Sequence, residues 1–227
     1  VREITLGSGE PLLTACGSNL FFVANDGTHG DELWRSDGTA EGTVMVKDIV
    51  PGADGSAPYN MTVLDSNLLF CANGQLWTSD GTEEGTFMVR DINNGQTSAD
   101  YLTALGSNLF FCVDDGLHGW ELWTSDGTET GTVMVRDICP GFSGSYPYNL
   151  VAMGSNLFFN ASDGIYGREL WKSDGTEDGT AMVKDIVPGS GGSSPEQVVA
   201  CGSRLFFNAN DGIHGQELWR SDGTRAG

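Results

Sequence analysis

The stretch Glu121–Ile138 reads ELWTSDGTETGTVMVRDI, and four further copies of this phrase, the last one cut short, run through the chain. The Trp of each copy gives the spacing of the repeat. These residues are Trp34, Trp77, Trp123, Trp171 and Trp219, which lie 43, 46, 48 and 48 residues apart. A repeat of this length is typical of β-propellers and other repeat arrays, so the spacing indicates a fold before any local pattern is considered.

The two ends of the sequence distinguish a ring from an open array. The last copy stops at Gly227, before its final strand, whereas the chain begins with Val1–Ile4 (VREI), which matches Val46–Ile49 and Val135–Ile138. A ring can close by lending its first strand to its last blade. We therefore expect an all-β fold, a five-bladed β-propeller of four-stranded antiparallel blades, closed by Val1–Ile4 pairing with Glu217–Ser221.

The repeat predicts one propeller domain over residues 1–227. Its blades are expected at about 5–49, 50–92, 93–138, 139–186 and 187–227, with 1–4 added to the last. Within the first repeat, strands are expected at Pro11–Cys16, Asn19–Asn25, Asp31–Ser36 and Val44–Ile49. The longer loops between second and third strands, and the linkers between blades, then share one face. Variable loops usually carry binding, so we expect the ligand there.

The charge of the chain limits its partners. There are 31 acidic and 11 basic residues, for a net charge of -20. This disfavours nucleic acid and anionic membranes, because phosphate binding needs a basic surface. No apolar run approaches the ~18 residues of a membrane helix, and no signal peptide is evident. The Val at position 1 fits a processed N-terminus. The acidic surface supports solubility, with bound cations as the alternative.

The five Cys residues fit no zinc motif. They occupy small apolar positions of the repeat, which favours core filling, although Cys16 and Cys201 would also suit a disulfide across the ring closure. Two N-glycosylation motifs begin at Asn60 and Asn160. Asn160 ends a predicted strand, so Asn60 is the better acceptor.

Most of the repeated phrase is interpreted as structural. The S-D-G-T segments predict tight turns, in which Asp bonds local amides and Gly takes a positive φ. The Trp residues are expected to pack between blades. The Glu before each Leu-Trp pair, as in Glu32, Glu121 and Glu169, is expected to form a cross-strand ion pair with a basic residue of the last strand. Those partners would be Lys47, Arg136 and Lys184.

The three His residues share one repeat position, in the pattern D-G-x-H/Y-G-x-E. They are His29, His118 and His214, with Tyr166 in the fourth repeat. One interpretation is a ring that stabilises its loop through an Nδ1 bond to the backbone. The other is a ring that contacts a ligand once per blade. His and Tyr are interchangeable for stacking on a sugar but not for binding a metal, which favours a neutral polar ligand.

Other residues of the same face extend this candidate site. The Asp that opens each loop would accept ligand hydroxyls or only shape the loop, and aromatic side chains nearby would contact ligand or pack the loops. The Asp residues are Asp26, Asp115, Asp163 and Asp211; the aromatic residues are Tyr59, Tyr148 and Trp120. No catalytic constellation breaks the repeat symmetry, so we expect no enzyme, no catalytic residue, no cofactor and no metal site, with calcium the one open alternative.

The phrase E-L-W-x-S-D-G-T-x-x-G-T resembles the ELWxxDGT repeat of secreted or surface proteins, whose functions are largely unassigned. The resemblance covers nearly the whole chain, with Gln75 in place of Glu in the second copy. In architecture alone, five units of this length are similar to the tachylectin propeller, a multivalent lectin. These resemblances imply a secreted or extracellular, multivalent, lectin-like propeller that binds glycans or glycoproteins. The alternative is a non-catalytic protein-interaction or surface-scaffold propeller, and a third possibility is stabilisation by calcium.

Overall fold

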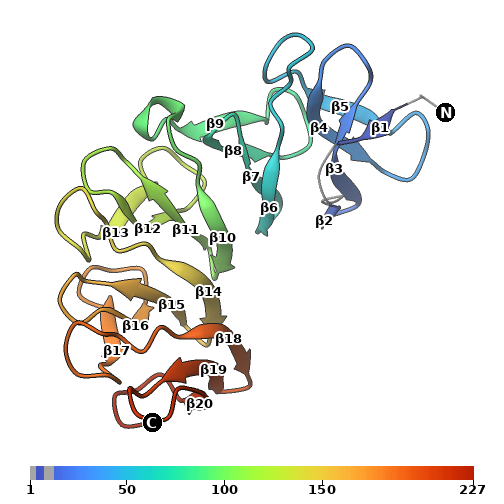
Figure 1. The fold of residues 1–227 in the computed structure, drawn as a ribbon. Helices are drawn as coiled ribbons and strands as arrows, with labels where there is room; N and C mark the ends of the chain where they lie inside the picture. The colour runs from blue at the N-terminus through green and yellow to red at the C-terminus, as the bar shows by residue number, and fades with distance from the viewer. Residues whose placement is uncertain (1–3, 8–12) are drawn as a thin grey trace. The chain divides into compact units, whose positions relative to one another are not determined.

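The structure is a computed structural model that describes residues 4–7 and 13–227, and nearly all its regular structure is antiparallel β-sheet. Five sheets follow one another along the chain (Figure 1). The first holds β1 (Thr5–Leu6), β2 (Thr14–Cys16), β3 (Asn19–Asn25), β4 (Asp31–Ser36) and β5 (Val44–Lys47). The second holds β6 (Tyr59–Leu64), β7 (Asn67–Ala72), β8 (Gln75–Ser79) and β9 (Phe87–Arg90).

A 3-10 turn, η1 (Asn93–Gly95), leads to the third sheet, β10 (Asp100–Leu105), β11 (Asn108–Asp114), β12 (Trp120–Ser125) and β13 (Val133–Arg136). The fourth sheet has β14 (Tyr148–Met153), β15 (Asn156–Ser162), β16 (Arg168–Ser173) and β17 (Ala181–Lys184). The fifth has β18 (Glu196–Cys201), β19 (Arg204–Asn210) and β20 (Gln216–Ser221). The sheets confirm a β-propeller-like all-β architecture of consecutive antiparallel sheets, of which the second, third and fourth have four strands.

Two compact units of the chain are described separately. One unit is Val1–Leu102 with Gly127–Glu129, and the other is Thr103–Asp126 with Thr130–Gly227. The repeat is nevertheless the same in each unit. In every four-stranded sheet the Leu of the third strand faces a Lys or Arg, the Trp faces a Met, and one bulge separates the two pairs.

The contacts within the S-D-G-T-x-x-G-T turn explain why these residue types recur there. In the second sheet, Asp80 Oδ1 accepts the Thr82 N–H at 2.8 Å and the Thr82 hydroxyl at 2.7 Å. The Ser79 hydroxyl lies 2.7 Å from that of Thr86, and accepts an amide N–H at 3.0 Å. A Cβ at Gly85 would sit 2.1 Å from the Asp80 carboxylate, so only Gly fits. The structural interpretation of this Asp is confirmed here and at Asp37, Asp174 and Asp222.

The predicted ion pairs of the ELW Glu are wrong. Glu121 is buried, and its Oε1 accepts the N–H groups of Cys139 and Ser145, both at 3.0 Å. The Ser145 hydroxyl donates to Oε2 at 2.5 Å. Glu32 and Glu169 bind the linkers after their own sheets in the same way. A buried Glu side chain surrounded by hydrogen-bond donors needs no basic partner, and it holds the linker against the sheet.

The basic residues bridge successive sheets instead. Lys47 donates to the carbonyl oxygens of Thr86 at 2.7 Å and Glu83 at 3.3 Å, both in the turn of the second sheet. Arg136 donates to the Thr180 carbonyl at 2.6 Å in the turn of the fourth. Sheet-to-sheet contact is therefore partly polar.

Three of the ELW Trp residues pack between sheets, as predicted. Trp171 joins a cluster with Phe110, Leu122, Val135 and Ile138 of the preceding sheet. Trp77 packs against the core formed by the first and second sheets, and Trp219 against that of the fourth and fifth. Burying an aromatic side chain between two sheets supplies much of the hydrophobic stabilisation of such a repeat.

The fifth sheet differs from the others at its outer edge. It consists of β18, β19 and β20, and no residue of the described ranges 4–7 and 13–227 pairs outside β20. Leu218 is consequently 75% exposed, whereas its counterpart Leu170 is 2% exposed. A groove of ≈170 Å³ lies beside this edge, lined by Trp219, Val183 and Ile186 among others.

The predicted closing strand Val1–Ile4 falls mainly on residues 1–3, which lie outside the described residues. Its last residue, Ile4, packs against Phe22 and Trp34 of the first sheet. The next residues form β1, which pairs with β3 through Thr5 and Leu6. Of the predicted strand Pro11–Cys16, the described part forms β2 (Thr14–Cys16).

The cysteine and glycosylation expectations are also resolved in part. All five cysteines are free in the structure, and the disulfide between Cys16 and Cys201 stays a prediction. Cys16 is buried and its thiol donates to the Ser66 carbonyl at 3.3 Å. Asn160 is fully buried and its amide donates to the Pro195 carbonyl, so it is inaccessible to glycosylation as expected. Within the described residues, no helix is long and apolar enough to cross a membrane.

Candidate functional site

One loop geometry recurs in the first, third, fourth and fifth sheets, between the second and third strands. In the third sheet, Asp115 Oδ1 accepts the N–H groups of Leu117 at 2.9 Å and His118 at 2.8 Å. The equivalent carboxylates make the same two bonds, at 2.8–3.1 Å. They are Asp26, Asp163 and Asp211. The loop Asp residues therefore shape the loop, which is one of the two roles predicted for them.

The second oxygen of this Asp holds the His ring. Nδ1 of His29, His118 and His214 lies 3.0, 2.8 and 2.8 Å from Oδ2 of the Asp three residues earlier. The predicted Nδ1 bond to the backbone is therefore wrong: the partner is a carboxylate. With Nδ1 occupied, each ring offers its Nε2 and its faces. The His side chains are 33–65% exposed, and Tyr166 in the fourth loop is exposed too.

In the third and fifth sheets, the Asp–His pair shifts the pKa of both groups. The hydrogen bond with Asp115, helped by nearby carboxylate charge, raises the pKa of His118. The Asp211 bond raises the pKa of His214 in the same way. Bonds from the His214 backbone and ring lower the pKa of Asp211 to about 2. Burial raises the pKa of Asp115, but its bonds to His118 outweigh this effect and lower it overall. These loops favour a charged pair at mildly acidic pH.

The linker that follows each sheet lies directly against the loop. The Trp120 carbonyl accepts the N–H groups of Ser145 at 2.9 Å and Tyr146 at 3.0 Å. A Cβ on Gly144 would meet the Trp120 nitrogen at 2.3 Å, and Gly144 has φ +67°, so this approach requires Gly. Loop and linker are therefore in direct contact.

The predicted aromatic residues take different places. Trp120 is the first residue of β12 and is half-buried, and its main chain binds the linker. Tyr59 is the first residue of β6, where burial raises its pKa to about 12. The Tyr148 hydroxyl donates to the Pro195 carbonyl at 3.3 Å. For Tyr148 the geometry matches the packing alternative.

The fourth sheet adds a basic residue that the sequence pattern did not single out. The Arg168 guanidinium lies 5.0 Å from the centre of the Tyr148 ring, and Nη1 donates to the Tyr146 carbonyl at 3.3 Å. Tyr146 itself is exposed. Arg168 occupies the repeat position of Asp31, Trp120 and Gln216. The residue at this position varies more between repeats than the residues beside it. This variation was the signal in the sequence that could have pointed to Arg168.

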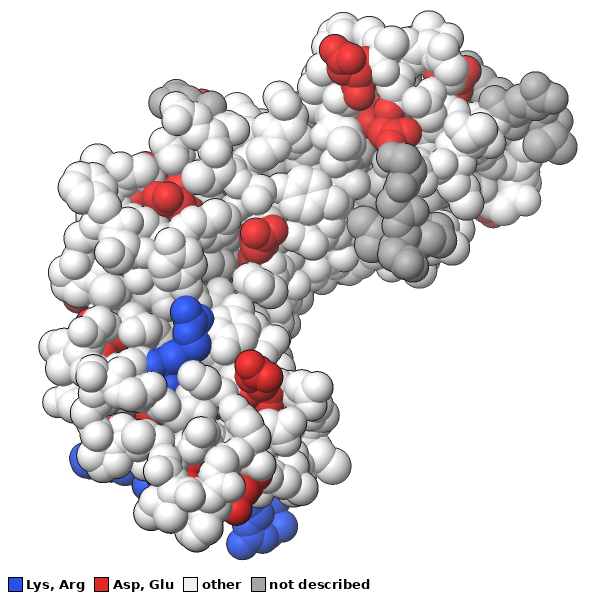
Figure 2. Space-filling view, viewed as in Figure 1, with Lys and Arg blue, Asp and Glu red and all other residues white. Residues whose placement is uncertain are grey.

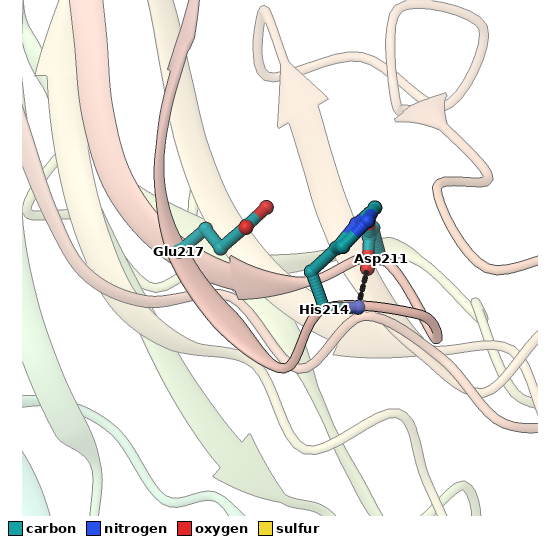
Figure 3. A group of neighbouring side chains, drawn as sticks. All are labelled: Asp211, His214 and Glu217. Atoms are coloured by element: carbon teal, nitrogen blue, oxygen red, sulfur yellow. Dashed lines mark hydrogen bonds and ion pairs between the residues drawn. The ribbon is translucent and has the colours of Figure 1, made fainter.

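Asp211, His214 and Glu217 of the fifth sheet form the one group of metal-ligand type among the described residues (Figure 3). Their ligand atoms lie within 4.8 Å of one another. Glu217 comes from β20 and is exposed, whereas its counterparts Glu121 and Glu169 are buried by their linkers. No described residue covers Glu217 as the linkers cover its counterparts, and we assign no metal to this group.

Charge does not mark any one loop. On the face drawn in Figure 2, acidic side chains are scattered and basic ones are few. The repeated loops are distinguished by apolar tips instead. Leu117, Ile165 and Ile213 are 66%, 65% and 81% exposed at the same position of three loops.

Comparisons with known proteins bear on the fold alone. No known protein family and no curated protein matches the sequence. Among solved structures, the computationally designed Ika8 protein matches with a TM-score of 0.51 and 16% identity, over 94% of this chain and 61% of that one. A puromycin hydrolase S511A mutant matches with a TM-score of 0.51 and 14% identity, over 92% and 33%. A puromycin-hydrolyzing peptidase of Mycobacterium tuberculosis matches with 0.50 and 14%, over 94% and 35%. The chain spans less than two thirds of the length of each structure, and at this identity the likeness is one of fold.

Proposed function

We propose that this chain is a non-catalytic, multivalent binding protein whose repeated D-G-x-H/Y-G loops contact a neutral polar ligand, with carbohydrate the favoured class. One observation carries the proposal. The same loop is built four times, and each time it presents a partly exposed His or Tyr ring. Weak single sites repeated on one scaffold gain strength through avidity.

The loop of the fourth sheet is the strongest single candidate. Tyr166 is exposed there, and the planar Arg168 guanidinium is fixed over Tyr148 next to the exposed Tyr146. Flat apolar faces beside fixed hydrogen-bond donors suit a sugar ring, which has both C–H faces and hydroxyl edges. The exchange of His for Tyr between loops keeps the ring face but not a metal ligand.

The experiment is a glycan array with labelled protein, in calcium and again in chelator. We expect binding to one sugar class, reduced by Tyr166→Ala and by His118→Ala without loss of fold. The matched control is Glu177→Ala, an exposed change in the turn at the other end of the strands. A blank array in both conditions would overturn the carbohydrate proposal, and loss of binding in chelator alone would indicate calcium.

A second candidate is a protein-interaction or surface-scaffold module. The exposed tips Leu117, Ile165 and Ile213 favour it, since apolar residues repeated in one loop position suit a protein surface better than a sugar. Replacing the three by Ser would abolish capture of a protein partner while leaving sugar binding intact. The opposite pattern would reject this candidate.

We also propose that the five sheets are the blades of one closed ring, completed by Val1–Ile4 beside β20. Two observations support this. The sequence of Val1–Ile4 matches that of Val46–Ile49, and Leu218 is exposed at an edge that an outer strand covers in every other sheet. A secreted or extracellular location, glycoprotein partners and the lack of enzymatic activity complete the proposal. They rest on the repeat resemblance and on the symmetry of the loops.

A further inference from the structure

Three sheets place a second carboxylate opposite the ELW Glu. It belongs to the Asp that follows the outer strand: Asp48, Asp137 and Asp185. Each lies one residue beyond the Lys or Arg that pairs with the ELW Leu, so it faces the Glu across the two strands. One oxygen, Oδ1, of each is buried without a hydrogen-bond partner. Burial raises the pKa of Glu32 and Glu121, and the charge of the neighbouring Asp raises it further. A buried carboxylate oxygen without a donor is costly, and its recurrence in three sheets calls for a common explanation.

The second sheet provides an internal comparison, because Gln75 replaces the Glu. Its amide Nε2 donates to Asp91 Oδ1 at 2.6 Å, and its Oε1 accepts the Ile92 N–H at 3.2 Å. Where the side chain carries a hydrogen, the bond to the Asp therefore forms. The backbone geometry of this position brings the two side-chain ends within bonding distance.

We propose that each Glu–Asp pair of the other three sheets binds one proton, which the Glu carboxyl donates to the otherwise unpartnered Asp oxygen. The protonated Glu then copies the Gln75 amide, and the pair carries one negative charge instead of two. The pKa of Glu121, raised to about 7 mainly by burial, agrees with this arrangement.

The groups around the third-sheet pair are few. Glu121 comes from β12, Asp137 from the end of β13, and the Ser145 hydroxyl and Cys139 thiol from the linker. The charges of both carboxylates help to raise the pKa of His118 in the adjoining loop. Its imidazolium form would favour their ionisation, but Asp115 already partners it.

As a consequence, Glu121 holds the linker less firmly as pH rises. Folded Glu121 keeps its proton to about pH 7, whereas in an unfolded chain Glu loses it near pH 4.3. The folded state therefore holds more protons between these values, so stability falls as pH rises through this window. Deprotonation sets two buried charges against each other where Glu121 fastens Cys139 and Ser145. The linker that they hold backs the His118 loop, so the loop would become mobile above neutral pH.

The test measures urea unfolding from pH 5 to pH 8 for the wild type, Glu121→Gln and the exposed control Glu196→Gln. For the wild type, this one pair should lower the folding equilibrium constant by up to about 100-fold across the range. Glu121→Gln should remove that part of the slope and be more stable than the wild type at pH 8. The control should keep the wild-type slope, including the part due to the histidines.

The reverse change, Gln75→Glu, tests the proposal even if Glu121→Gln does not fold. It creates a Glu–Asp pair with Asp91, so it should add pH dependence to the wild-type curve. The proposal is overturned if Glu121→Gln keeps the full wild-type slope, or if Gln75→Glu leaves the slope unchanged.

Discussion

Replacing Leu218 by Ala tests whether the last sheet gains a fourth strand in solution. In the three-stranded sheet this side chain is 75% exposed, and the β20 edge beyond it is uncovered among the described residues. Its counterpart Leu170 has the same neighbours in sequence but is covered by β17, with Leu170 facing Lys184. The two positions are therefore a matched pair that differ in one strand.

The structure sets the magnitude of each change. Leu170→Ala removes a fully buried side chain and should cost about 2–5 kcal/mol of unfolding free energy. Leu218→Ala should cost a similar amount if a closing strand covers it, but less than about 0.5 kcal/mol if the edge stays open. The exposed loop residue Leu117 gives a third variant, which should change stability by no more than about 0.5 kcal/mol in either case.

The assay is urea unfolding followed by Trp fluorescence, at two protein concentrations to detect cover by a second molecule. We predict a concentration-independent loss for Leu218→Ala close to that of Leu170→Ala. A Leu218→Ala variant as stable as Leu117→Ala would refute ring closure by Val1–Ile4.

Three further outcomes follow from single contacts. Gly179→Ala should cost about 1–3 kcal/mol, because the new Cβ would lie 1.9 Å from the Asp174 carboxylate; a melting curve like that of the wild type would contradict the turn geometry. Arg136→Met should cost about 1.5 kcal/mol, because the charged donor to the Thr180 carbonyl is lost; urea unfolding measures it, and no loss would mean that this bridge is dispensable. His118→Ala should lose stability mainly at acidic pH, because the raised pKa of His118 means that its stabilisation is present below about pH 6.5 and fades as pH rises through the folded value; an equal loss at pH 5 and pH 8 would show that the ion pair contributes little.

The repeat predicted much of the fold because periodicity is a property of the sequence itself. The strand Asn19–Asn25 was predicted with the bounds that the structure gives it. The turn chemistry at Asp80 and the inter-sheet role of Trp171 also follow from local geometry and size. Ring closure stays a prediction from the matching ends of the sequence, because it depends on how distant parts of the chain meet.

The candidate site was predicted only in outline. The repeat position of His118 marked the loop, but whether Asp115 faced ligand or its own loop depended on bonds of one turn. Glu121 was assigned an ion pair because sequence offers a basic neighbour across the strand. The structure instead gives it Ser145, which is 24 residues away, and a pattern of charges along a strand cannot reveal such a partner.

The number of ligand sites per chain decides whether the repeated loops bind the ligand. Calorimetric titration with the strongest sugar from the array would measure this number for the wild type and for variants of single loops. We predict more than one equivalent site, with one site lost in Tyr166→Ala and another in His118→Ala. A single site, or sites that survive both changes, would contradict the assignment of binding to the repeated loops.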